Sequence, residues 1–148
     1  MAGVATIRLG ELTDGGTMAT LSDRAKDLLR RPIFAFATVV RSDGSLHSTV
    51  VWVDCDGEDV IFNTAVGRVK ERILRRDPRV SVSLVDPDDG FHALSVFGTA
   101  DLELEGADAV INALSHKYTG RDYVGRGLDE QRITVRVAPV AVIYSPGR

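Results

Sequence analysis

The sequence predicts a mainly β domain: a six-stranded antiparallel β-barrel with two or three helices set between the strands. Apolar, β-branched segments of strand length occur at 34–40, 45–54 and 60–64, and short sequences rich in Asp, Gly and Ser join them at 42–44 and 54–59. Strands joined by such short turns pair as antiparallel hairpins. A closed or partly closed barrel is favoured over an open sheet because closure removes exposed strand edges.

Length and composition indicate one globular domain. The chain has 148 residues, 44% of them hydrophobic, and a net charge of −3, which disfavours general nucleic-acid binding. Residues 1–17 show no periodicity and are expected to be an unanchored leader, which leaves 18–148 as a single domain. The start of the chain lacks the features of a signal peptide, and no apolar run reaches the roughly 20 residues that cross a bilayer. We therefore expect a cytoplasmic protein with no membrane partner.

The first helix is expected directly after the leader. Thr20 and Asp23 have the spacing of a capping box, and apolar residues follow at helical periodicity until Pro32 ends the helix. The strand at 34–40 is apolar on both faces and is therefore expected to be fully buried. The strand at 45–54 alternates, and its Trp52 is interpreted as packing in the core or at a subunit interface.

The segment 67–79 is a basic island in an acidic chain. It holds six basic and two acidic residues, a net charge of +4, and it follows the strand at 60–64 through a turn at Gly67. Its pattern is that of a helix. The N-terminus of a helix has free N–H groups and a partial positive charge, both of which favour a bound anion such as phosphate. The alternative is a solvated basic helix face without a ligand.

The rest of the chain supplies further strands at 80–86, 91–104 and 132–144, a helix at 107–118 and a glycine-rich loop at 119–130. The long strand at 91–104 is expected to bend at Gly98. Arg132 and Arg136 alternate with inward apolar residues, so both are expected to face solvent. For Tyr123, in the loop, a capping role over a cleft and no role at all remain open.

No sequence motif indicates a metal site or a nucleophile. The three histidines, His47, His92 and His116, are scattered, and Cys55 is single and expected in a turn without an activating base. The sequence therefore predicts no metal, and an enzyme built from it needs a cofactor for its difficult step. His47, His92 and Tyr118 are candidate proton donors, and no catalytic residue is assigned.

The chain resembles the pyridoxamine 5'-phosphate oxidase-like split-barrel family over about residues 21–144. The segments that carry the resemblance are FAFATVVRSDGSLHSTVVWV at 34–53, FNTAVGRVKERILRRDPRVSVSLVDPDDGF at 62–91 and FGTADL at 97–102. The second segment is similar to the actinobacterial, F420-dependent (deazaflavin) oxidoreductase branch, whose members use coenzyme F420 in place of FMN. The resemblance implies an FMN-binding split barrel that forms homodimers, with two cofactors held at the subunit interface.

The resemblance also implies which residues bind the cofactor. Arg68 and Lys70 match the phosphate-binding pair, and Asn63 and Thr64 match residues that line the cofactor's side chain. Phe91 stands where an indole is usual in the family. The remaining matches are His47, Ser48 and Thr49, expected to edge the deazaflavin ring, and Phe91 and His92, expected to approach the cofactor from the partner chain.

The implied function is an F420-dependent reductase that transfers a hydride from reduced deazaflavin to a small unsaturated or heteroaromatic substrate. Two alternatives stay open: an FMN-dependent oxidoreductase of the same fold, and a non-catalytic flavin- or deazaflavin-binding protein. F420 is polyanionic, so the distal Arg72, Arg75 and Arg76 favour it over FMN. Oxidation of pyridoxamine phosphate is disfavoured, because the end of the chain offers only Arg132 and Arg136 for a substrate phosphate.

Overall fold

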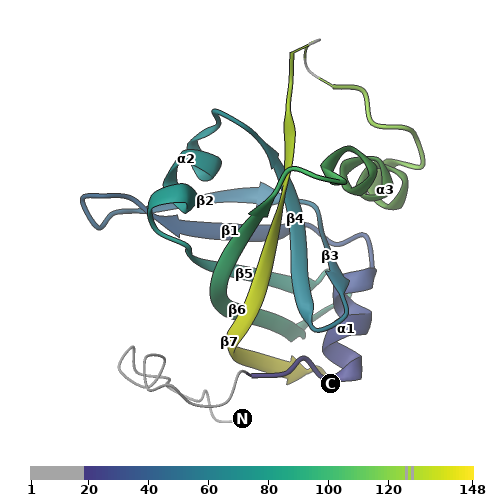
Figure 1. The fold of residues 1–148 in the computed structure, drawn as a ribbon. Helices are drawn as coiled ribbons and strands as arrows, with labels where there is room; N and C mark the ends of the chain where they lie inside the picture. Colours follow the sequence, from purple (N-terminus) through teal and green to yellow (C-terminus); the bar gives the residue numbers. More distant parts are fainter. Residues whose placement is uncertain (1–18, 126, 128) are drawn as a thin grey trace.

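The computed structural model describes residues 19–125, 127 and 129–148, so the predicted leader at 1–17 lies outside the described residues. One antiparallel sheet of seven strands has the order β2-β1-β5-β6-β7-β4-β3, and three helices surround it (Figure 1). The strands are β1 Ala35–Val40, β2 Leu46–Val51, β3 Val53–Asp56, β4 Asp59–Ala65, β5 Arg79–Asp86, β6 Asp89–Glu103 and β7 Arg132–Pro146. The helices are α1 Asp23–Arg30, α2 Val69–Arg76 and α3 Ala107–Thr119. The predicted mainly β split barrel is confirmed.

The sheet curls because one predicted strand serves both of its edges. The sequence predicts a single strand at 45–54, whereas the structure divides it at Trp52 into β2 and β3, which gives seven strands instead of six. Val51 pairs with Ala35 of β1, while Val53 pairs with Phe62 of β4 at the opposite edge. The two edges of the sheet are therefore adjacent in the chain at Trp52, and the sheet closes on itself there (Figure 1).

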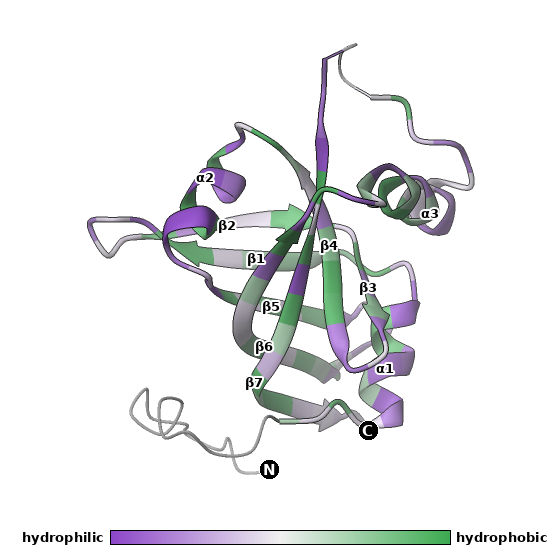
Figure 2. Cartoon of the chain, viewed as in Figure 1, coloured by the Kyte–Doolittle hydropathy of each residue, from purple (hydrophilic) through white to green (hydrophobic). Residues whose placement is uncertain are grey.

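The core fills the inside of this curled sheet. Every strand contributes at least one buried side chain, and Val39, Val53, Phe62, Val82 and Val96 are fully enclosed. Hydrophobic residues run along the strands, whereas α1 and α2 carry many hydrophilic residues (Figure 2). Alternation along each strand places these side chains on one face, which the barrel encloses.

The outer face of β1 and β2 contradicts the prediction of a fully buried strand at 34–40. Phe36 on β1 is 55% exposed, and Val50, its register partner on β2, is 53% exposed. Phe34, Leu46 and Val85 are exposed as well. A continuous apolar run indicates that both faces avoid water, but it does not say whether this chain or another one covers them.

Local details follow the sequence with small shifts. The N-cap of α1 is Ser22 and not Thr20, because the Ser22 hydroxyl accepts a hydrogen bond from the backbone N–H of Ala25 at 3.2 Å. Cys55 lies in β3 and not in a turn. The predicted bend at Gly98 is confirmed by a register shift between Phe97 and Gly98.

Two side chains tie α3 to the rest of the barrel. Lys117 Nζ donates to the carbonyl oxygens of Leu29 and Val53 at 2.5 and 2.6 Å. The Tyr118 hydroxyl donates to the carbonyl of Ile33 and accepts from the backbone N–H of Val53 at 3.1 Å. These bonds hold α3 beside the β2–β3 junction. In the part of the chain that the structure describes, no helix is long and apolar enough to cross a membrane.

Candidate functional site

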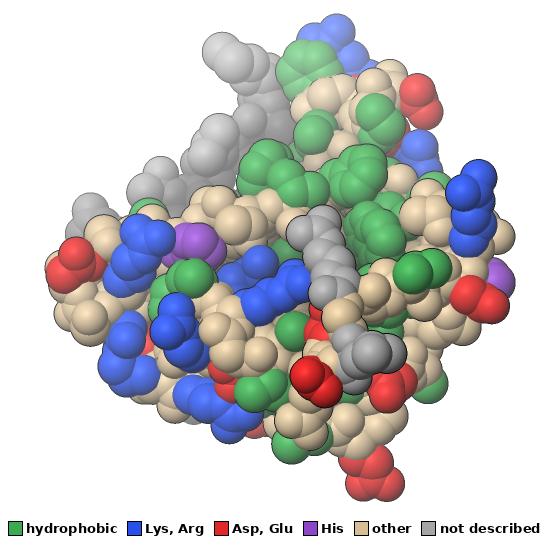
Figure 3. All heavy atoms as spheres, turned by 90° about the horizontal axis from the view of Figure 1, so that it is seen from above, with side chains coloured by type: hydrophobic (Ala, Val, Ile, Leu, Met, Phe, Trp, Pro, Cys, Tyr) green, Lys and Arg blue, Asp and Glu red, His purple; other side chains and the backbone are tan. Residues whose placement is uncertain are grey.

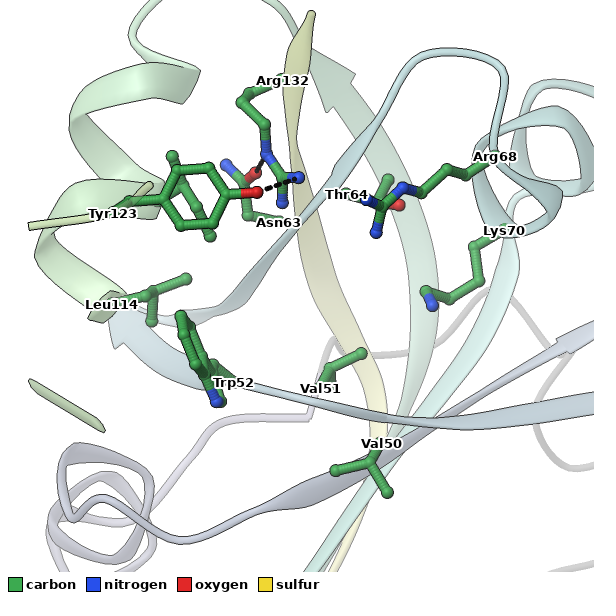
Figure 4. Close-up of a pocket in the computed structure, with 11 residues that line it drawn as sticks. Val50, Val51, Trp52, Asn63, Thr64, Arg68, Lys70, Leu114, Tyr123 and Arg132 are labelled. Carbon is green, nitrogen blue, oxygen red and sulfur yellow. Dashed lines mark hydrogen bonds between the residues drawn. The ribbon is translucent and has the colours of Figure 1, made fainter. Parts of the chain in front are cut away.

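A cavity of about 250 Å³ lies where the β2–β3 junction, β4, the start of α2, α3 and β7 meet. Its lining side chains lie between residues 50 and 132 of the chain and project toward one another from several elements (Figure 4). They are Val50, Val51, Trp52, Asn63, Thr64, Arg68, Lys70, Ile111, Leu114, Tyr123 and Arg132.

Three cations form the polar end of the cavity: Arg68, Lys70 and Arg132. Arg68 is the N-cap residue of α2, and Lys70 follows in its first turn. Lys70 Nζ donates to the Thr49 hydroxyl at 2.7 Å. Burial lowers the pKa of Lys70, and the nearby charges of Arg68 and Arg132 lower it further. Positive charge is concentrated here, so an entering anion is stabilised.

Thr64 supplies an unused polar group in the same wall. The residue is 2% exposed, and its hydroxyl has no hydrogen-bond partner among the described residues. A buried hydroxyl without a partner costs about 1–3 kcal/mol relative to one that is hydrogen-bonded. A ligand oxygen or nitrogen that reached this hydroxyl would satisfy it.

The prediction that Arg132 faces solvent is wrong. The residue is 7% exposed, donates from Nε to Asn63 Oδ1 at 2.7 Å, and places its guanidinium over the ring of Tyr123, 5.0 Å from the centroid. Alternation along β7 does turn it out of the barrel core, but α3 and the segment after α3 cover that side. Arg136 is partly exposed and pairs with Asp56, Asp59 and Glu103. The hydrogen bond to Glu103, and then that to Asp56, raise the pKa of Arg136.

The other end of the cavity is apolar and aromatic. Trp52 lines it together with Ile111 and Leu114, and the indole stacks on the ring of Tyr118 at 5.5 Å with an interplanar angle of 13°. Trp52 is only partly buried and is not part of the hydrophobic core, so the predicted core packing is wrong, while packing at a subunit interface stays a prediction. Figure 3 shows the molecule from above. Lys and Arg side chains gather on one side of the surface in this view, and hydrophobic side chains lie beside them. This arrangement suits a ligand with one anionic part and one flat, apolar part.

The structure brings together four of the predicted site residues, Asn63, Thr64, Arg68 and Lys70, in one cavity. Thr49 contacts it through Lys70. Ser48 instead faces outward and shares a hydrogen bond of 2.9 Å with the Thr38 hydroxyl. His47 lies farther along β2, where its Nδ1 is 2.8 Å from Arg41 Nη2. Burial lowers the pKa of His47, with Arg41 and Lys70 adding to the effect.

Phe91 and His92 lie on β6 and do not line the cavity of their own chain. His92 Nδ1 is 3.1 Å from Asp86 Oδ2, and its Nε2 is 2.9 Å from the Tyr144 hydroxyl. The Arg148 guanidinium lies 3.9 Å from the centroid of the Phe91 ring. Their predicted approach to a cofactor across a subunit interface stays a prediction.

The basic helix is less free than its sequence indicates. Buried Glu71 accepts hydrogen bonds from the Gly67 backbone N–H at 3.0 Å and from Arg75 Nε, so it occupies part of the helix N-terminus. Burial raises the pKa of Glu71, but these hydrogen bonds outweigh it and leave the pKa below its ordinary value. Arg76 donates to the carbonyl of Val40 at 3.2 Å. Arg68 and Lys70 at the first turn are the cations of this helix that reach the cavity.

The sequence did not predict Arg132 as a cavity residue, and it left open whether Tyr123 caps a cleft or has no role. The Tyr123 hydroxyl donates to Glu130 Oε1 at 2.7 Å and accepts from Arg132 Nη1 at 3.1 Å. The contact between Arg132 and Tyr123 joins a strand to a glycine-rich loop, and no periodicity in the sequence indicates such a contact. Among the described residues, no three side chains of the His, Cys, Asp and Glu types are grouped as metal ligands.

Sequence comparison assigns the chain to a family. The profile of the pyridoxamine 5'-phosphate oxidase family matches residues 21–144, and the chain therefore belongs to this family of flavin-dependent oxidoreductases, whose fold binds flavin or deazaflavin cofactors. No curated protein is similar enough in sequence to count as a match.

Solved structures agree with this fold. An F420 reductase is similar with a TM-score of 0.72 and 28% sequence identity, over 80% of this chain and 94% of that one. A conserved hypothetical protein from Mycobacterium tuberculosis is similar with a TM-score of 0.73 and 22% identity, over 88% of each chain. For a pyridoxamine 5'-phosphate oxidase-like protein from Listeria innocua the TM-score is 0.66 and the identity 18%, over 82% of this chain and 95% of that one.

Proposed function

We propose that this protein is an oxidoreductase that uses coenzyme F420 to reduce a small unsaturated or heteroaromatic molecule. The observation that carries the proposal is the unpartnered Thr64 hydroxyl beside Arg68 and Lys70, in a cavity whose other end is aromatic. The similarity to a solved F420 reductase, at 28% identity over nearly all of that chain, supports the choice of cofactor.

The residues present fit such a cofactor. Arg68 and Lys70 would hold its phosphate through charge-assisted hydrogen bonds, and Thr64 would add a third bond. Asn63 is already fixed by the side chain of Arg132 and by the Ala107 carbonyl, to which its Nδ2 donates at 3.0 Å. A side chain held in this way orients a ligand without losing further conformational freedom. When bound, the deazaflavin supplies the hydride.

The protein's part in the reaction is then to position the reactants and to exclude water. Trp52, Ile111 and Leu114 form a dry wall, and the stack on Tyr118 keeps the indole in place. Tyr118 is unsuited to donate a proton, because its hydroxyl is bonded to two backbone groups and burial raises its pKa. We assign no proton donor within this chain's cavity.

A second candidate is an FMN-dependent oxidoreductase of the same fold. The pairing of Arg75 with buried Glu71 favours it, because an arginine held by its own chain offers less to the additional negative charges of F420. FMN needs a site for one phosphate, which Arg68 and Lys70 provide without the distal arginines. The third candidate is a protein that binds flavin or deazaflavin without catalysing a reaction.

We also propose that the protein acts as a homodimer that uses the outer face of β1, β2 and β5. The apolar side chains exposed there are Phe34, Phe36, Leu46, Val50 and Val85. Several large apolar side chains exposed on one face of a globular domain are typical of a subunit interface. Val50 both belongs to this face and lines the cavity, so a second copy would border the site.

The activity test follows the oxidation of chemically reduced F420 in the presence of a panel of unsaturated and heteroaromatic acceptors. Reduced FMN serves as the comparison. Acceptor-dependent oxidation of F420 that is lost in the Lys70→Ala, Arg68→Ala double variant supports the proposal. Oxidation with reduced FMN alone selects the second candidate, and turnover with neither leaves a binding protein.

A further inference from the structure

Glu130 lies beside the cationic end of the cavity and is bonded to it. Its Oε1 accepts hydrogen bonds from Arg132 Nη1 at 2.5 Å and from the Tyr123 hydroxyl at 2.7 Å, and its Oε2 is 3.6 Å from Arg68 Nη2. The Glu130 side chain is only 11% exposed. All three partners line the cavity. A carboxylate of the chain itself therefore uses donors that an anionic ligand would otherwise find there.

The space around Glu130 is hollow on its other side as well. Glu130 lines a second cavity of about 340 Å³, formed by α3 and the segment after it. Ile111, Tyr123 and Arg132 line both cavities. The second cavity thus offers space next to Glu130 that its side chain does not fill at present.

Exchanging one carboxylate for another at Arg132 requires little free energy. The attraction within a buried ion pair is largely offset by desolvation, and the large cost arises when one partner is left unpaired. Meanwhile the pKa of Lys70 is lowered by burial and then by the charges of Arg68 and Arg132, although Glu130 lies close to both arginines. An anion that replaced Glu130 at Arg132 would enter the cavity that Lys70 also lines.

We propose that Arg132, Tyr123 and Arg68 form a carboxylate-binding subsite, which Glu130 fills until a carboxylate-bearing ligand displaces it. The ligand class follows from the present occupant: one oxygen accepts from both Arg132 and Tyr123, and the other faces Arg68. The inference deepens the proposed function by naming a second anionic group that the cavity accepts. It rests on that function only in that the cavity binds an anionic ligand.

The test compares three variants of the full chain. Glu130→Gln keeps the size of the side chain and removes its charge, whereas Glu130→Asp keeps the charge and is one methylene group too short to make the same contacts. Asp122→Asn is the control, because Asp122 lies in the same segment, is exposed and pairs with His116 outside both cavities. The probes are glutarate, which has two carboxylates but no ring and no phosphate, and inorganic phosphate. Binding is followed by thermal shift and by the fluorescence of Trp52, the single tryptophan.

We expect glutarate to bind about tenfold more tightly to both Glu130 variants, the size of one charge-assisted hydrogen bond. The affinity for phosphate should change less in these variants. The Asp122→Asn variant should bind both probes as tightly as the parent protein does. Tighter binding by Glu130→Gln alone would mean that the carboxylate acts through its field while staying in place, and would overturn the displacement. Unchanged or weaker glutarate binding in both variants would overturn the subsite. Because glutarate is neither flavin nor deazaflavin, these outcomes are independent of whether F420 or FMN binds.

Discussion

Lys70 and Thr49 join α2 to β2 at the wall of the cavity, through a hydrogen bond of 2.7 Å from Nζ to the threonine hydroxyl. The hydroxyl is neutral, so it orients the ammonium without cancelling its charge. Arg68 and Arg132 are near enough to lower the pKa of Lys70 beyond the effect of burial. A partly buried ammonium close to two other cations is stabilised by a bound anion. The proposed cofactor site depends on this stabilisation of Lys70.

Replacing the two cations of α2 tests the phosphate site. In the Arg68→Ala, Lys70→Ala double variant, we expect cofactor affinity to fall by about 3 kcal/mol, or roughly 100-fold, because two charge-assisted hydrogen bonds are lost. Titration by fluorescence measures the change. Arg79→Ala is the matched control, since Arg79 is an exposed cation that pairs with Asp77 away from the cavity. An equal loss in both variants would show a general charge effect and not a site.

The pH dependence should reflect the lowered pKa of Lys70. Its charged form is disfavoured in the folded state, so the stability of the free protein should rise as pH increases through the folded pKa toward the ordinary value of 10.5. Affinity for an anionic cofactor should fall over the same range, because binding needs the ammonium. Lys70→Met should flatten both profiles. Profiles of the variant and the parent that coincide would contradict the assignment of this cation.

Gly98 should be irreplaceable in the bend of β6. A Cβ added at Gly98 would lie 2.1 Å from the carbonyl oxygen of Ala138, a backbone atom that cannot easily move. We expect Gly98→Ala to lower the free energy of unfolding by about 2–4 kcal/mol, as overpacking against a rigid neighbour does. Denaturant unfolding measures it. Gly90→Ala is the control on the same strand, because a Cβ there meets no atom within 4 Å.

The outer face of β1 and β2 provides a test of the homodimer. Phe36→Glu places a charge in the exposed apolar face, and we expect it to shift the protein to monomers in sedimentation and to weaken cofactor binding. Val124→Glu changes an apolar residue that is more exposed than Phe36, 85% against 55%, and lies away from the sheet, so it should do neither. If the parent protein sediments as a monomer, the proposed interface is wrong.

Local sequence signals accounted for much of this fold. The hairpin turns, the bend at Gly98 and the strand, turn and basic helix at 60–79 depend on neighbouring residues, and their patterns predicted them. The division of a strand at Trp52 was not predictable, because residues on its two sides pair with opposite edges of the sheet. That choice is made by long-range pairing, which periodicity does not report.

The candidate site was also predictable only in part. Asn63, Thr64, Arg68 and Lys70 are close in sequence, and they lie together in one cavity. Arg132 was assigned to solvent because alternation describes only the barrel interior. What covers its other side, α3 and the segment with Tyr123, is brought there by tertiary packing.

The most direct measurement is a titration of the purified protein with F420 and with FMN at low and at high salt, followed by quenching of Trp52, the single tryptophan, which lines the cavity. We expect saturable quenching by F420, weakened by salt, with weaker binding of FMN. Preferential binding of FMN would contradict the choice of cofactor. Binding of neither, or quenching that survives the loss of both Arg68 and Lys70, would mean that this cavity does not hold the anionic cofactor.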